Sequence, residues 1–524
     1  MSSGTSLLLV ATLLFSCGSD DEQDDPAAGS SGGSGNQDDG AVAGVNGGDG
    51  DGDGGSSGSN EDGDDAGTGG AAGNDAATSA DGGLADGTCG ATPLDGCAAS
   101  ELAAVFVDAA ALNGGDGSLT NPVNSIAEAL SLAVARGATD IYVCAGDYDE
   151  NVVITANETG IDLHGGFNCD GFSYDAALIS RIEPTGGGLP LHVDGINTSM
   201  IIDDLQFSAL DAVAAGDSSV AALVTGSADV TFNRVVFAAG TGADGDDGAP
   251  VGITFPNSLS ALNGFNGESP NGGNMSIENI CPAGDSSQGA LGGSGGFAGE
   301  DGLPTGRGGS GGELGSCGPT GDGAEGSPGP DGAEGAGGLR VTMDADGLVP
   351  HDGADGIAGE VGGGGGGGAG ESTDGGGGGG AGGCGGNGGA GGQSGGSSIG
   401  LVVFDANVSL NACELIASDA GAGGDGTSGQ LGQALSVGGD LASFGGLGDG
   451  GACDGGRGGA GGDGGGGGGG AGGTSAGVLW ENTNSTVTIE PSSHFTVGLA
   501  GDIGLGGGVA NDGANGASDE VVGQ

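Results

Sequence analysis

Two pairs of neighbouring carboxylates, Asp203–Asp204 and Asp246–Asp247, are the clearest candidates for chemistry in this sequence. Enzymes that hydrolyse glycosidic bonds place two carboxyl groups on either side of the bond, one as acid and one as base or nucleophile. Asp203–Asp204 follows an apolar strand pattern and falls at a corner of the chain, and Asp246–Asp247 lies in a glycine-rich segment. We therefore expect both pairs to be solvated residues without a catalytic role.

Other kinds of reactive site are not found in the sequence. It has no cluster with metal-ligand spacing, no Ser-His-Asp or Cys-His arrangement, and no glycine run with the lysine of a phosphate-binding loop. Asp49, Asp51 and Asp53 are spaced as at the start of an EF-hand loop, but Asn60 stands where the bidentate glutamate belongs. We expect no cofactor, and the acidic runs leave weak calcium binding open.

The charge of the chain limits its partners. Its 524 residues carry 71 acidic side chains against six arginines and no lysine, a formal net charge of −65. Nucleic acid is not expected as a partner, because binding to phosphates needs a basic surface, and direct adsorption to anionic lipid is disfavoured for the same reason. Glycine supplies 139 residues and aromatic residues only 3 %, so a single globular core cannot extend over the whole length.

The first residues have the pattern of an export signal. Leu7 to Phe15 form an apolar run that is too short to cross a bilayer but fits the core of a signal peptide. The LFSC sequence that follows resembles the lipobox of bacterial lipoproteins, which implies that residues 1–17 are the signal segment and that Cys17 is lipidated. Because Gly18 is not aspartate, the resemblance implies the outer membrane or cell surface. Residues 18–88 are expected to be a disordered acidic tether.

Secondary structure is expected from about Cys89 onward. Ser125 and Glu128 have the spacing of a capping box, and Gly137 can end a helix, so a helix is predicted at 125–136. Its apolar face would consist of Ile126, Leu130, Ala133 and Val134. Short strands are predicted at 105–107, 141–144, 152–154 and 161–163.

Four segments share one pattern of short strands: 191–212, 218–248, 397–426 and 474–507. Units of about 20 residues cannot bury an apolar face alone, so they must stack on one another. Alternating apolar residues with Asn and Gly at the corners predict stacked β-strands. The helix would then cover the open first end of the stack.

Residues 105–154, VFVDAAALNGGDGSLTNPVNSIAEALSLAVARGATDIYVCAGDYDENVVI, resemble the N-terminal part of bacterial pectin-lyase-like proteins. The segment LHGGF and the later repeats resemble a subset of that family with glycine-rich, PGRS-like insertions. The resemblance implies an all-β fold: a right-handed single-stranded parallel β-helix with an N-terminal capping helix and long Gly-rich insertions at a corner. It implies no established activity.

The same resemblance raises one enzyme hypothesis, the cleavage of acidic polysaccharide. Lyases of this fold use clustered carboxylates for calcium and a basic residue as proton abstractor. His164 and Arg181 are the basic residues to consider, but neither has the G-H-G or R-I-K flanks of polygalacturonase-like members. Since a surface this negative would also repel an acidic polymer, we expect no enzyme activity.

The glycine-rich segments divide the predicted fold. The β-helix would span 89–240 and continue at 397–419 and 474–498, with inserts at 241–396 and 420–473 and a Gly-rich tail at 499–524. Both inserts leave the repeat at the same position, so they should emerge side by side at one corner, beside the tail. Residues 323–337 have Gly at every third position, as in collagen, but the run is too short for a triple helix. The inserts are either flexible or packed as extended glycine strands joined by backbone hydrogen bonds.

Ten cysteines in an exported chain predict disulfides. Cys413 aligns with Val235, an apolar position, and is expected to be a buried free thiol. With Cys17 lipidated, eight cysteines remain, and spacing alone does not fix how they connect. The expected pairs are Cys89–Cys97, Cys144–Cys169, Cys281–Cys317 and Cys384–Cys453.

These observations favour a non-enzymatic, structural or adhesive lipoprotein of the cell surface. Its partners would be the membrane, through the lipid anchor, and polysaccharide or other surface proteins. A carbohydrate-active β-helix that binds or cleaves polysaccharide is the first alternative, and calcium-dependent surface assembly is the second.

Overall fold

The computed structural model describes residues 104–433, 445–448, 451–481 and 483–524. The chain divides into two compact units, Met1–Asp81 and Gly82–Gln524, and every described residue belongs to the second. Cys17, the expected tether and the expected pair Cys89–Cys97 lie outside the described residues.

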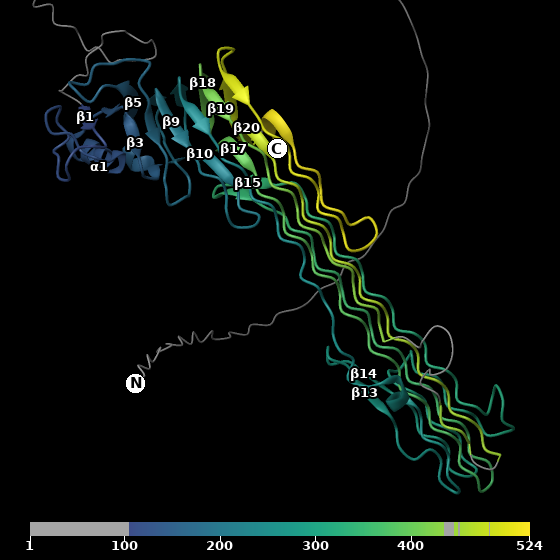
Figure 1. Cartoon of the computed structure of the whole chain (residues 1–524). Coiled ribbons are helices and arrows are strands. Elements are labelled where there is room, and N and C mark those ends of the chain that lie inside the picture. Colours follow the sequence, from purple (N-terminus) through teal and green to yellow (C-terminus); the bar gives the residue numbers. More distant parts are fainter. Residues whose placement is uncertain (1–103, 434–444, 449–450, 482) are drawn as a thin grey trace, which may run out of the picture. The chain divides into compact units, whose positions relative to one another are not determined.

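Strands β1 to β12 and β17 to β23 form three parallel sheets, several strands of which are labelled in Figure 1. From β7 onward the chain visits the second, first and third sheet in rotation, so each circuit adds one strand to each sheet. The first sheet holds β1 (Ala104–Val107), β2 (Asp140–Cys144), β5 (Asp162–Phe167), β8 (Met200–Asp203), β11 (Val230–Asn233), β18 (Asn407–Asn411) and β21 (Thr486–Ile489). The second holds β4 (Val152–Ile154), β7 (Leu191–Asp194), β10 (Ser219–Thr225), β17 (Ser398–Phe404), β20 (Ser475–Trp480) and β23 (Ser518–Gly523). The third holds β3 (Gly146–Tyr148), β6 (Ser180–Ile182), β9 (Leu205–Ser208), β12 (Val236–Ala238), β19 (Glu414–Ile416) and β22 (His494–Thr496). The structure is therefore all-β with long parallel sheets.

The strand register confirms the alignment of the repeats. Ser219 pairs with Ser398, which pairs with Ser475 in the next circuit. Val230 pairs with Val408 in the same way. The apolar core lies between the sheets, where equivalent side chains of successive circuits are fully buried against one another: Leu163, Ile202, Phe232 and Leu410 in one row, and Phe207, Phe237 and Leu415 in another.

The helix α1 (Ile126–Arg136) packs against the first circuit, next to β1 and β2. Ser125 accepts the backbone N–H of Glu128 at 3.1 Å, and Gly137 ends the helix with a φ of 70°, both as predicted. This hydrogen bond is the Ser125 half of the predicted capping box. The N–H groups of Ile126 and Ala127, the first two of the helix, donate to the carboxylate of Glu150. Val134 is 46 % exposed, so its predicted place on the buried face was wrong.

A serine at the start of each later strand of the second sheet holds the point where a glycine run leaves the sheets. Ser398 Oγ accepts the N–H of Ser418 at 2.8 Å and donates to the carbonyl of Gly240 at 2.7 Å. Ser219 and Ser475 each make the equivalent pair of hydrogen bonds. The repeated serine therefore fixes all three exits at one corner.

The runs that leave this corner lie side by side, as predicted. Figure 1 shows them as parallel ribbons that continue beyond the sheets. The first insert donates to the second through Gly242, Gly245 and Gly248, and the second donates to the tail through Ala420, Gly423 and Gly426. We call the hydrogen-bonded runs within 240–396, 418–433, 445–448, 451–473 and 498–517 the glycine bundle. The bundle also includes the hairpins β13 (Glu278–Ile280) with β14 (Ser286–Gln288) and β15 (Thr342–Asp344) with β16 (Gly347–Val349), and the short 3-10 helix Leu259–Leu262. A second 3-10 helix, Ala156–Glu158, lies among the sheets.

The central run, 362–370, shows how the bundle is held. Gly362 donates to the carbonyl of Gly383, Gly363 to that of Ser327 and Gly364 to that of Leu303, at 2.8 to 2.9 Å. The next two triplets of the run repeat these three directions. A period of three residues without internal hydrogen bonds is the geometry of a polyproline II-type helix. Of the two structures left open by the sequence, the described inserts adopt the one joined by backbone hydrogen bonds.

Close approach of the runs explains why the contact positions are glycine. A Cβ on Gly366 would lie 2.0 Å from the carbonyl oxygen of Ser310, and most bundle glycines face a backbone atom at a similar distance. Because three residues make one turn, each position of a triplet faces one direction. The central run, with neighbours in every direction, is glycine except for Ala369, whereas 323–338 has glycine mainly at every third position. The collagen-like spacing thus marks a run at the edge of the bundle.

Replacement of Gly366 by alanine tests this packing. The new Cβ cannot be accommodated by a side-chain movement, because the atoms that it meets are backbone atoms of Ser310 and Gly309. We expect Gly366→Ala to reduce the free energy of unfolding by roughly 3 kcal/mol or more, measured by urea denaturation of the full chain. Gly252→Ala is the matched control, since no atom lies within 4 Å of its Cβ position. Equal stability of the two variants would contradict the packing.

Candidate functional site

A group of buried and half-buried polar side chains lies along one column of the first sheet. Tyr142, His164, Asp203, Asn233 and Asn411 pair in register through β2, β5, β8, β11 and β18. The side chains contact one another in the same order, and the four polar ones, together with Asp140, are called the polar ladder here. Successive contacts along the column are a ring stack at 5.4 Å and hydrogen bonds of 3.1, 2.6 and 2.8 Å.

His164 is the charged centre of the polar ladder. Its Nδ1 lies 3.1 Å from Asp203 Oδ2 and its Nε2 lies 3.3 Å from Asp140 Oδ1. Burial alone would lower the pKa of His164, but the hydrogen bonds and charges of Asp140 and Asp203 outweigh it and raise the pKa to about 9. Burial also acts to raise the pKa of Asp140, yet the hydrogen bonds from His164 and Thr139 hold it below its usual range. At neutral pH the imidazolium donates to both carboxylates.

This geometry favours a structural ion cluster over a reactive site. Asp140, Asp162 and His164 bring their ligand atoms within 4.8 Å of one another, as a metal site would. A metal needs a free nitrogen lone pair on the imidazole, but both ring nitrogens face carboxylates at hydrogen-bond distance. Both carboxylates share the single positive charge of His164, which lowers the cost of burying them but offsets one of their two negative charges.

The other close groups of potential metal ligands in the described residues contain cysteines that are already paired. They are Asp108 with Cys144 and Cys169, and Asp322 with Cys317 and Cys453. A sulfur in a disulfide is not the thiolate that binds metal. These groups therefore offer no metal site while the bridges are intact.

The structure separates the two members of the Asp203–Asp204 pair. Asp203 faces His164 and Asn233, whereas Asp204 has a left-handed backbone with φ of 52° and binds Arg234 through two hydrogen bonds of 2.7 Å. Arg234 has the same left-handed conformation one circuit later. The two carboxylates turn to different partners and do not flank a common space, as acid and base of a hydrolase would.

The Asp246–Asp247 pair belongs to the glycine bundle. Asp246 accepts the N–H of Gln393 with its carbonyl, and the carboxylate of Asp247 accepts the N–H of Asp425 at 2.8 Å. The remaining candidate base, Arg181, lies 3.5 Å from Asp147 on the third sheet, apart from His164 on the first. Of the carboxylates and basic residues considered from sequence, the structure brings Asp203 and His164 together in the polar ladder. The pair Asp246–Asp247 and Arg181 lie apart from them, in the glycine bundle and on the third sheet.

Acidic residues of the bundle share a role that the sequence analysis missed. Gly332 donates to the carbonyl of Asp463, while the carboxylate of the preceding Asp331 accepts the N–H of that same Asp463 at 2.8 Å. We call this pair of bonds the acidic clamp. The carboxylate takes the place of a backbone carbonyl as acceptor for this N–H. It thereby completes the backbone hydrogen bonding at the edge of the bundle. Clamps of this kind occur at Asp244, Asp247, Asp322, Asp331, Glu334, Asp419 and Asp425.

The sequence held a signal for both features. Asn233 and Asn411 end aligned strands, which marks the column of the ladder, and acidic residues recur directly before glycine in the inserts, which marks the clamps. Neither pattern identified the residues that these side chains bind, because the binding partners lie in other circuits of the sheets or in other runs of the bundle.

The disulfides correct two of the expected pairings. Cys144–Cys169 is present as expected, but Cys281 pairs with Cys384 and Cys317 with Cys453. The expected pairs Cys281–Cys317 and Cys384–Cys453 were wrong because the chain doubles back at 371–374, which brings 384 beside 281 and leaves 453 beside 317. Cys413 is a buried free thiol, as predicted, and burial raises its pKa to about 11.

Comparison with known proteins gives no further guide to the site. No protein-family model, curated protein or solved structure matches this chain at a significant level. In the described residues, no helix has the length and apolar character needed to cross a membrane.

Replacement of His164 by glutamine tests the charge of the polar ladder. The folded-state pKa of about 9 exceeds the ordinary histidine pKa of 6.5, so the stabilisation is complete below pH 6.5 and is lost as the pH rises through 9. The wild-type free energy of unfolding should therefore fall across this window by about 3 kcal/mol more than that of His164→Gln. Urea denaturation at a series of pH values measures the difference.

The matched control is His494→Gln, because His494 is exposed on β22. Its pH profile should follow that of the wild type. The charged ladder is contradicted if the profile of His164→Gln also runs parallel to the wild type between pH 6.5 and 9.

Proposed function

We propose that this chain is an exported, lipid-anchored protein of the cell surface with a structural or adhesive role. In this proposal the three sheets form a right-handed parallel β-helix of the pectin-lyase-like kind, which serves as the base of the glycine bundle. The observation that carries the proposal is the continuous backbone hydrogen bonding between both inserts and the tail.

Hydrogen bonding between runs turns flexible sequence into a rigid extension. The run 353–370 has 18 residues, so in the extended three-residue geometry it reaches about 55 Å. A free glycine chain of that length has a mean end-to-end distance of roughly 25 Å and no fixed direction. Packing therefore doubles the reach of the segment and fixes where its end lies, which is what a presenting surface requires.

Exposed apolar side chains lie at the far end of the bundle, around the turn 371–374. Phe297, Leu314 and Leu447 are 67, 60 and 62 % exposed. Gly370 binds the carbonyl of Phe297 at 2.9 Å, and the disulfide Cys317–Cys453 joins two of the runs beside the turn. Large apolar side chains held on a rigid, otherwise polar surface are typical of a contact with another macromolecule.

The uses of the acidic residues support a non-enzymatic role. Asp203 and Asp204 are bound to side chains of neighbouring strands, and Asp247 forms an acidic clamp. Each carboxylate pair that could serve a hydrolase therefore has a partner that accounts for its position.

The triple variant Phe297→Ser, Leu314→Ser, Leu447→Ser tests the adhesive end. We expect cells that display it to attach to polysaccharide- and protein-coated surfaces at less than a tenth of the wild-type level. The unfolding temperature of the purified chain should not change, because these side chains are exposed. A triple variant of exposed residues among the sheets, Leu112→Ser, Ile179→Ser and Val213→Ser, is the control and should attach like the wild type.

Protease shaving of intact cells provides the localisation arm of the same experiment. Shaving should remove the wild-type chain from cells, and Cys17→Ala should release the chain into the medium. Protection of both chains from shaving, or unchanged attachment of the first triple variant, would contradict the proposed role.

A further inference from the structure

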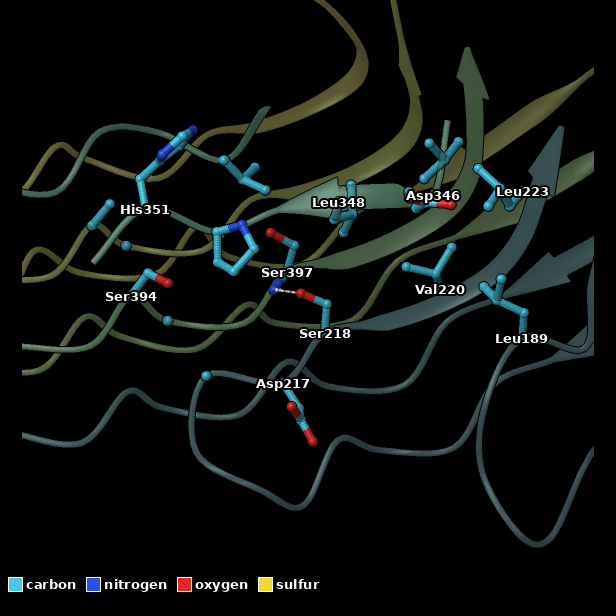
Figure 2. A pocket seen from close by; sticks show the side chains of 18 residues that line it. Leu189, Asp217, Ser218, Val220, Leu223, Asp346, Leu348, His351, Ser394 and Ser397 are labelled. Carbon is cyan, nitrogen blue, oxygen red and sulfur yellow. Dashed lines mark hydrogen bonds between the residues drawn. The ribbon is translucent and has the colours of Figure 1, made fainter. Parts of the chain in front are cut away.

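A cavity of about 290 Å³ lies where the hairpin of β15 and β16 packs against the second sheet. Figure 2 shows the side chains that line it. The side toward β10 and β17 is apolar, and it is formed by Leu189, Val220, Leu223, Leu348 and Val402. The volume is close to the lower end of the range for small-molecule sites.

The opposite side of the cavity is polar. Figure 2 places Ser394 and His351 together, apart from Leu189 and Leu223. Ser394 is 4 % exposed, and its hydroxyl oxygen has no hydrogen-bond partner among the described residues. The nearby Ser397 differs, since its N–H donates to Ser218 Oγ at 2.8 Å and its own Oγ accepts the N–H of Thr474. A buried hydroxyl without a partner is costly unless something else in the cavity binds it.

We propose that this cavity is a binding site for a small neutral amphiphile, a short alkyl chain that carries one hydroxyl group. The alkyl chain would lie against Val220, Leu223 and Leu348. Its hydroxyl would exchange a hydrogen bond with Ser394 Oγ, which can both donate and accept.

The charges around the cavity determine the class of ligand. The lining includes Asp217 and Asp346 and contains no arginine or lysine, and Nε2 of His351 is already hydrogen-bonded to Thr342 Oγ1 at 2.8 Å. A carboxylate or phosphate would therefore find no permanent cation in the lining. The net charge of −65 adds to this repulsion. Figure 2 shows the carboxylate of Asp217 directed away from Leu348 and Ser397, so it is not placed to bind an ammonium group inside. The other carboxylate, Asp346, is exposed at the turn between β15 and β16, and Figure 2 shows it apart from Ser394. A neutral head group at Ser394 therefore fits the lining best.

The position of the cavity gives binding a structural consequence. Leu348 belongs to β16, Val220 to β10 and Ser394 to a run of the glycine bundle. A ligand in contact with all three would link the hairpin to the second sheet and to the run of the bundle that holds Ser394. Binding should therefore slow amide hydrogen exchange in β15 and β16.

Titration of the full-length protein with 1-hexanol, followed by saturation-transfer NMR, tests the site. We expect saturable binding with a Kd on the order of 1 mM, which is ordinary for a ligand of about seven heavy atoms. Hexanoate at the same pH should bind at least tenfold more weakly. Hydrogen-exchange mass spectrometry with saturating hexanol should show slower exchange at 342–349.

Two variants distinguish a specific site from general apolar binding. Ser394→Ala should weaken hexanol binding about five- to tenfold, the effect of one hydrogen bond, while it leaves the affinity for cyclohexane unchanged. Leu348→Trp should fill the cavity and abolish the binding of both probes, whereas Leu314→Trp at the exposed far end should not. The proposal is overturned if hexanol binding is not saturable, if Ser394→Ala binds hexanol like the wild type, or if ordered water alone occupies the cavity.

Discussion

Backbone chains can be hydrogen-bonded to neighbours in every direction only where no Cβ stands between them, and the whole glycine bundle depends on this. At Gly366 the space for a Cβ is already occupied by the carbonyl of Ser310 on one run and that of Gly309 beside it. The glycines of the bundle are therefore the equivalent of a core: they allow close contact in place of side-chain packing. The entropy lost by ordering so much glycine is large, and the hydrogen bonds between runs must offset it.

The sheets and the bundle are built in register with each other. Ser219, Ser398 and Ser475 pair across the second sheet, and the same hydroxyls hold the residues at which the glycine runs depart. In each of these three circuits, a new glycine run thus starts at the residue that the serine of that circuit binds. The acidity of the chain follows in part from the same arrangement, because aspartate is the shortest side chain that can accept an exposed backbone N–H as a strong, charge-assisted acceptor.

Much of the sheet architecture could be predicted from the sequence, and the physical reason is locality. The pattern around Val230 and Val408 is complete within one circuit, and so is the helix that starts at Ser125 and ends at Gly137. The structure of the inserts could not be decided in this way, because a glycine run has no side chains to indicate its neighbours. Two disulfide pairings were predicted wrongly for the same reason, because the partner of Cys281 is set by a turn of the bundle and not by distance along the chain. The polar ladder was visible as aligned asparagines, but the charge on His164 depends on two carboxylates from other strands.

The role proposed for the glycine bundle rests on one physical property, the hydrogen-bonded structure of its glycine runs. Native-state hydrogen exchange measured by mass spectrometry tests it most directly, with the peptide 353–370 compared with peptides from β17 and from an unfolded reference. Every N–H of the central run 362–370 donates to a neighbouring run, so exchange should be slowed as strongly as in β17. Exchange at the rate of the unfolded reference, with β17 still protected, would contradict the account.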